Sequence, residues 1–157
     1  MLRLATAADL EALVAIAGRL DIAKTLATDV VEDLTAALDH EAGELLVIED
    51  DDGELVGGLR WVLVNRRSRI ASIHSLMIHP AVRGRGLATG AIRDLAERLF
   101  TVHWLHRAEA EVYGFNHAAQ RVFERAGFVH EGVRRRAYDR EDGWQDGIRY
   151  GLLADER

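Results

Sequence analysis

The stretch from Ile70 to Val112 constrains the fold more than any other part of the sequence. Ile70 to Ile78 has the apolar content of a strand, and Pro80, the only proline in the chain, marks its end. A loop rich in glycine and arginine follows, after which apolar residues recur at helical spacing from Leu87 to Leu99. Arg107 to Val112 is typical of another strand. This order predicts a helix packed on a sheet.

Further strands are expected on both sides of this unit. Leu45 to Glu49 and Glu54 to Val64 predict a hairpin joined by an acidic turn. After a helix from Asn116 to Ala126, a last hairpin begins at Phe128 and returns from Trp144 to Leu153. Strands that alternate with helices in the middle and pair as hairpins at the ends predict a mixed α/β fold. We expect a central sheet of about seven strands flanked by about four helices.

The N-terminal segment predicts a short strand and two helices. Leu2 to Ala5 has a strand pattern, and Thr6 with Asp9 forms an N-cap pattern. The apolar face of the first helix is expected to run as far as Leu20, and a second helix is expected over roughly Asp29 to His40.

Composition excludes several classes of function. The net charge of -6 would repel nucleic acid and anionic membranes, so neither is expected as a partner, whereas cationic substrates would be attracted. The absence of cysteine removes disulfides, thiolate metal sites and a cysteine nucleophile. Asp9 and Glu11 interrupt the apolar N-terminal stretch, so we expect no signal peptide and a cytoplasmic location. A single domain is expected over residues 1–157, of which 48% are apolar.

The loop from Arg83 to Ala88, Arg-Gly-Arg-Gly-Leu-Ala, has the chemistry of an anion site. Glycines let the backbone approach a phosphate closely, and the first amides of the following helix lack internal partners. A tight surface turn with two solvated arginines is the alternative. The loop has no Gly-Lys-Ser/Thr sequence and no third glycine at dinucleotide spacing, which disfavours ATP and NAD.

Arg83, Gly86 and Ala88 match in register the acetyl-CoA motif Arg/Gln-x-x-Gly-x-Gly/Ala of a known family. With Leu76 to Pro80 before them, they resemble the GCN5-related N-acetyltransferase family and its fourth strand. The pattern is most similar to the branch that contains ribosomal-protein N-terminal (alanine/serine) acetyltransferases and polyamine acetyltransferases. The resemblance continues at His106 to Val112, Asn116, Ala126 to Phe128, Glu131, Gly132 and Arg135.

The resemblance implies an acyl-CoA N-acyltransferase fold and an acetyl-CoA-dependent enzyme. Acetyl-CoA would be the co-substrate, and the acceptor would be a peptide N-terminus, a polyamine or another small amine that attacks the thioester directly. The fourth strand would splay from its neighbour, so that its backbone binds the pantetheine and polarises the carbonyl. Asn116 would reach the cofactor arm or simply cap its helix. The implied cofactor residues are Leu76, Met77, Ile78, Arg83, Gly84, Arg85, Gly86, Leu87, Ala88, Thr89, Asn116, Ala119 and Phe123.

The proton-transfer groups depart from the family pattern. Many members carry tyrosine at the position of Phe123, and the N-terminal-acetylating branch often has serine at that of Ala119, but neither residue of this chain donates a proton. Water, Tyr113 or Tyr138 could replace them, and packing is the alternative role of both tyrosines. A non-catalytic sensor of acyl-CoA is therefore a rival function, and a scaffold domain with an incidental glycine loop is another.

Three residues are candidates for the catalytic base. His74 titrates near neutral pH, and Ser72 lies nearest the same position of the family pattern. Glu111 on the next strand could take an ammonium proton or hold the substrate. His74 could instead be a partly buried structural residue. Because His74 and His79 should point to opposite faces of a strand, no metal site is expected.

The acceptor pocket is expected to come from the first two helices and the last hairpin. Trp61 and Trp144 are candidates to line it. The free edge of the last hairpin could also pair with a second copy of the chain, which would give a homodimer.

Overall fold

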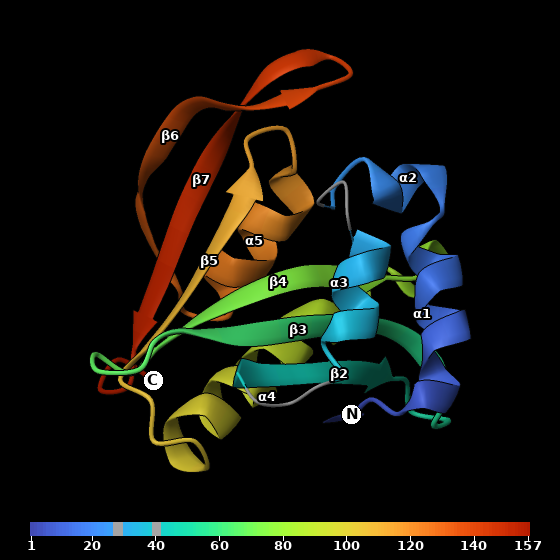
Figure 1. Cartoon of the computed structure of the whole chain (residues 1–157), viewed down its shortest axis with the longest axis horizontal. Helices are drawn as coiled ribbons and strands as arrows, with labels where there is room; N and C mark the ends of the chain where they lie inside the picture. Colours follow the sequence, from blue (N-terminus) through green and yellow to red (C-terminus); the bar gives the residue numbers. More distant parts are fainter. Residues whose placement is uncertain (27–29, 39–41) are drawn as a thin grey trace.

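One mixed seven-stranded sheet forms the centre of the protein (Figure 1). The computed structural model describes residues 1–26, 30–38 and 42–157. The strand order is β1-β2-β3-β4-β5-β7-β6, and among the strands of these described residues only β4 and β5 pair in parallel. The predicted fold class is thus confirmed. The strands are β1 Leu2–Leu4, β2 Gly43–Glu49, β3 Leu55–Asn65, β4 Ile70–Ile78, β5 Arg107–Tyr113, β6 Val129–Arg140 and β7 Gly143–Leu153.

Helices cover both faces of the sheet (Figure 1). The described residues form α1 Leu10–Ala17, α2 Leu20–Ala23, α3 Val30–Ala36, α4 Leu87–Thr101 and α5 His117–Arg125, with short 3-10 turns η1 Ala7–Asp9 and η3 Pro80–Val82. These are five α-helices, where about four were expected. No helix in the described ranges is long and apolar enough to cross a membrane.

The period-two alternation of the strands divides the core into two layers. On β2, Leu46 and Ile48 pack with the buried face of α4, whereas Leu45 and Val47 pack with α1 and α3. All four side chains are at most 1% exposed. The sheet is therefore filled on both sides, which leaves its central strands as the rigid support for any site at their ends.

The N-terminal helices differ from the sequence prediction in their boundaries. The Thr6 and Asp9 capping pattern is confirmed, since the Thr6 backbone N–H donates to Asp9 Oδ2 at 2.8 Å. Leu20 was wrongly placed on the apolar face of the first helix. That helix ends at Ala17, the backbone becomes extended at Arg19, and Leu20 begins α2 with 90% of its surface exposed. The expected ends of the next helix, Asp29 and His40, lie outside the described residues.

β4 and β5 pair over only part of their length. The parallel register joins Ile70 through Ile73 to Arg107 through Ala110 and then stops, although both strands continue. Beyond this point the two strands diverge (Figure 1). The splayed fourth strand expected from the family resemblance is therefore present, and the gap between the strands faces α5.

A β-bulge in β4 lies where the strands part. From His74 to Met77 the chain advances three residues while the paired β3 advances two, and Ser75 has a φ of 55°. The bulge shifts the alternation by one residue. As a result Leu76 and Ile78 pack on the same side as Ile73, whereas Met77 joins the opposite core layer.

Candidate active site

Two adjoining cavities lie around the separation of β4 and β5. The loop cavity lies beside the glycine loop and is lined by residues of β4, the start of α4 and α5. The central cavity lies beside the parted strands and also receives Thr25 and Leu26, which follow α2, together with residues of α3 and β6. The residues that line both are Thr25, Leu76, Asn116 and Ala119. The two cavities therefore meet beside the β4 bulge.

The loop cavity brings together most of the residues expected around a cofactor. Its walls include Leu76, Met77, Ile78, Arg83, Gly84, Gly86, Leu87, Ala88, Thr89, Asn116 and Ala119. Phe123 lines the central cavity instead. Arg85 is exposed and lines neither cavity.

Gly84 and Gly86 give the loop the shape of an anion cradle. Their φ values are +82° and +75°, a region that favours glycine, and a Cβ built on either would meet no atom within 4 Å. The first backbone bond of α4 runs from the Gly90 N–H to the Gly86 carbonyl, so the amides before Gly90 lack partners inside the helix. Arg83 beside them has no ion pair with any described residue. Free amides and an unpaired cation thus face the same space.

β4 turns backbone donors toward the cavities. The His79 N–H donates to the Val56 carbonyl of β3 at 2.7 Å. Because alternate residues of a strand direct their N–H groups to opposite sides, Leu76 and Ile78 direct theirs toward the side where β5 has departed. These donors can therefore serve a ligand between the strands.

Asn116 and Phe123 of the α5 region hold the far wall. Asn116 caps the helix, since its Oδ1 accepts from the Ala119 N–H at 3.1 Å, and it also lines both cavities. Phe123 is 2% exposed and packs against Phe128 and Tyr150, at centroid distances of 5.2 and 6.0 Å. These contacts fix the position of α5 against the sheet.

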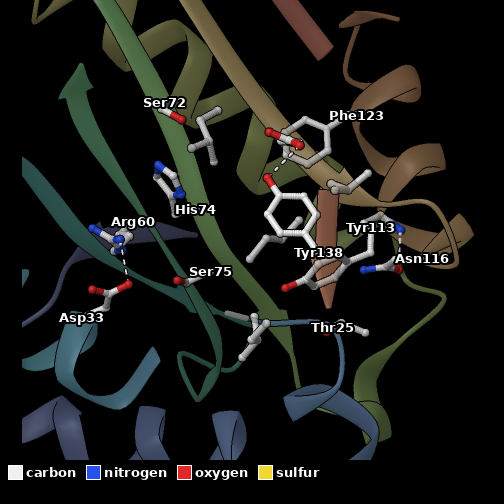
Figure 2. Close-up of a pocket in the computed structure, with 16 residues that line it drawn as sticks. Thr25, Asp33, Arg60, Ser72, His74, Ser75, Tyr113, Asn116, Phe123 and Tyr138 are labelled. Carbon is white, nitrogen blue, oxygen red and sulfur yellow. Dashed lines mark hydrogen bonds and ion pairs between the residues drawn. The ribbon is translucent and has the colours of Figure 1, made fainter. Parts of the chain in front are cut away.

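Ser72 and His74 lie on the cavity side of β4 (Figure 2). His74 retains an exposed edge in the cavity, but the surrounding protein lowers its pKa by desolvation. Arg60 lowers the pKa further, and Asp33 opposes this effect. His74 is therefore held as the neutral imidazole at pH 7, which is the form that can accept a proton.

Glu111 faces the central cavity from β5 and is tied to β6. Its Oε1 accepts from the Tyr138 hydroxyl at 2.8 Å, and its Oε2 accepts from Arg134 Nη1 at 3.2 Å. Tyr113 lines the same cavity, but its ring stacks on Phe115 and its hydroxyl accepts from Arg140 Nη1 at 3.3 Å. Glu111, the third candidate for the base, therefore already accepts hydrogen bonds from Tyr138 and Arg134.

Sequence reasoning missed an ion pair in the cavity wall. Arg60 Nη2 and Asp33 Oδ2 lie 2.9 Å apart although the residues are 27 positions apart in the chain (Figure 2). The two tryptophans expected in an acceptor pocket, Trp61 and Trp144, do not line the central cavity. Trp61 is 5% exposed and donates its indole N–H to Glu44, and Trp144 is 63% exposed at the hairpin end. Thr25, Leu26, Asp33 and Tyr138, which come from the N-terminal region and the last hairpin, line that cavity.

The sequence and fold match known acetyltransferases. Residues 10–128 match the model of the Acetyltransferase (GNAT) family. The probable N-acetyltransferase YjcK of Bacillus subtilis is 30% identical over 95 residues, which are 60% of this chain and 52% of that protein. Spermidine N(1)-acetyltransferase of Vibrio cholerae is 30% identical over 105 residues, 66% of this chain and 60% of that protein. The chain thus spans little more than half the length of these relatives.

A solved structure shares nearly the whole fold. The crystal structure of spermidine N-acetyltransferase from Vibrio cholerae in complex with CoA and spermine superposes with a TM-score of 0.86 at 24% identity, over 99% of this chain and 96% of that one. The match of the family model covers most of the sequence and includes the glycine loop and the parted strands. The chain therefore belongs to the Acetyltransferase (GNAT) family.

Proposed function

We propose that this protein is an acetyl-CoA-dependent N-acetyltransferase. It would move an acetyl group to a primary amine, either a peptide N-terminus or a small amine such as a polyamine. The observation that carries the proposal is the meeting of the loop cavity and the central cavity beside the separation of β4 and β5. A donor in the first cavity and an acceptor in the second would react at the wall they share.

The loop cavity fits the coenzyme by its chemistry. The open space beside Gly84 and Gly86, the free amides at the start of α4 and the unpaired Arg83 suit a diphosphate. The N–H groups of Leu76 and Ile78 suit the amide-bearing pantetheine arm. When bound, acetyl-CoA supplies an acyl thioester as the acetyl donor.

Residues of β4 and β5 would polarise the carbonyl and accept the proton of the amine. A backbone N–H of β4 near Leu76 polarises the carbonyl as negative charge develops on its oxygen. His74, neutral at pH 7, takes the proton of the attacking amine. Ser72 and Glu111 are the alternative groups on the same cavity.

The function itself is tested by release of coenzyme thiol from acetyl-CoA across a panel of acceptors. N-terminal peptides, polyamines, aminoglycosides and amino acids each offer a primary amine of different shape and charge. We expect turnover with at least one of them, together with a mass increase of one acetyl group in the product. Binding of acetyl-CoA without turnover on any acceptor would favour the sensor function, and no binding at all would favour the scaffold.

The cradle predicts that Gly86→Val weakens acetyl-CoA binding. A β-branched side chain would fill the open space at the amides and strain a φ of +75°. We expect the dissociation constant, measured by calorimetry, to rise about tenfold or more, which is roughly 1.4 kcal/mol. Gly53→Val is the matched control, because Gly53 has a φ of +79° and equally open space but lies in the β2–β3 turn. Equal affinity in both variants would refute the cradle.

The role of His74 predicts a pH dependence of kcat/KM. Because its pKa lies below the ordinary value of 6.5, the imidazole is neutral above that range, and the rate should fall as pH decreases through the lowered pKa. His74→Ala should be slow throughout and should lack this acidic limb, with acetyl-CoA affinity unchanged. Ser72→Ala should retain the limb. If His74→Ala keeps the wild-type profile and Glu111→Gln loses it, Glu111 is the base.

Three further features belong to the same proposal. We propose one N-acetyltransferase domain over residues 1–157, a cytoplasmic location, and a homodimer that pairs through β6, an edge of the sheet. The mass of the protein in solution by light scattering tests the last of these. A monomer at all concentrations contradicts it.

A further inference from the structure

In the proposed reaction the departing thiolate takes up a proton, and the residues of α5 that line the central cavity cannot donate one. Phe123 and Ala119 occupy the helix positions that face the cavities, and neither carries a hydroxyl. Thr25 is also in the shared wall, but its hydroxyl donates to the Ile22 carbonyl at 2.6 Å. A side-chain donor would therefore come from another element of the central cavity.

On the basis of the proposed function, we propose that Tyr138 of β6 is the catalytic acid and that Glu111 and Arg134 position it. The Tyr138 ring lies in the central cavity across from His74 (Figure 2). Its hydroxyl donates to Glu111 Oε1 at 2.8 Å and accepts from Arg134 Nη1 at 3.0 Å. A single phenol is thus held between a carboxylate and a guanidinium, in the cavity that borders Leu76.

The backbone around Tyr138 is built to make this contact. Gly147 of β7 lies between β5 and β6, and a Cβ on it would overlap Glu111 Oε1 and approach Tyr138 Cε2 to 2.9 Å. Any larger residue at position 147 would therefore push Tyr138 and Glu111 apart. A glycine within a strand often marks such a close approach.

β6 also bulges directly before Tyr138. From Arg134 to Tyr138 the chain advances four residues, while their partners Gly147 and Gln145 on β7 are two positions apart. Arg136 within this bulge has a φ of 45°, and the Asp146 carboxylate accepts its N–H at 2.8 Å. Non-glycine residues in this conformation are strained, and such strain clusters at functional sites.

The charges around Tyr138 suit an acid. Burial and the hydrogen bond to Glu111 raise the pKa of Tyr138 above its ordinary value, so the phenol stays protonated at neutral pH. The charged and titratable groups that face it are Glu111 and Tyr113 of β5 and Arg134 of β6. Once the phenol has lost its proton, Arg134 Nη1 remains as a donor to the phenolate oxygen.

The step balances without another reactant. The amine nitrogen bonds to the acyl carbon, the carbon–sulfur bond breaks, and the sulfur takes the phenolic proton of Tyr138. The proton released by the amine passes to the base on β4, and solvent then returns one proton to the phenolate as that base is deprotonated.

Tyr113 provides a matched control. It lines the same cavity, but Arg140 engages its hydroxyl and its ring stacks on Phe115 at 5.2 Å. Tyr138→Phe and Tyr113→Phe each remove one hydroxyl and keep the ring. We expect kcat to fall about 100-fold or more in Tyr138→Phe, within the usual range for loss of an acid catalyst. Tyr113→Phe should stay within about twofold, and both variants should bind acetyl-CoA as the wild type does.

A second substitution separates acid catalysis from a structural role. Replacement of Tyr138 by 3,5-difluorotyrosine keeps the ring and its hydrogen bonds but makes the phenol more acidic. We expect the alkaline limb of the kcat profile to move to lower pH. A wild-type rate in Tyr138→Phe, or an alkaline limb that does not move, overturns the inference while the proposed function stands. Absence of turnover in the wild-type protein overturns both.

Discussion

Both cavities depend on the point where β4 and β5 stop exchanging hydrogen bonds, after Ile73 and Ala110. Before this point the strands share a packed core, with Ala71 and Ala108 fully buried. Beyond it each strand is held by its other neighbour, since β4 stays paired with β3 as far as Ile78 and β5 with β7 as far as Tyr113. The strands can part without unfolding, and the backbone groups freed on the inner sides require a partner from outside the sheet.

The bulge at Ser75 determines which groups of β4 face each cavity. Before it, polar side chains of β4 face the central cavity, and after it apolar side chains and backbone amides border the loop cavity. A left-handed φ at a serine costs about 1–3 kcal/mol, which the surrounding strands must offset. One strained residue therefore sets the border between the polar central cavity and the backbone-lined loop cavity.

The sequence predicted what depends on local pattern. Alternation, turn residues and helical periodicity specify β2 to β7 and α4. In the loop between Arg83 and Ala88, the glycines themselves indicate backbone with positive φ. Contacts between distant elements carry no such pattern. The Arg60–Asp33 pair joins a strand to a helix, and the Tyr138–Glu111 bond crosses β7 at Gly147. No local feature distinguishes these residues from solvated ones, and nothing in Ile70 to Ile78 marks Ser75 as a bulge.

The two cavities share four lining residues, but each also has walls of its own. The glycine loop and the start of α4 line the loop cavity alone, whereas Leu26, Asp33 and Tyr138 line the central cavity alone. Substitutions at Leu26, Asp33 or Tyr138 leave the lining residues of the loop cavity unchanged. Under the proposed function, acceptor preference can therefore drift over evolutionary time while the acyl donor stays the same, and relatives with one fold can come to modify unrelated amines.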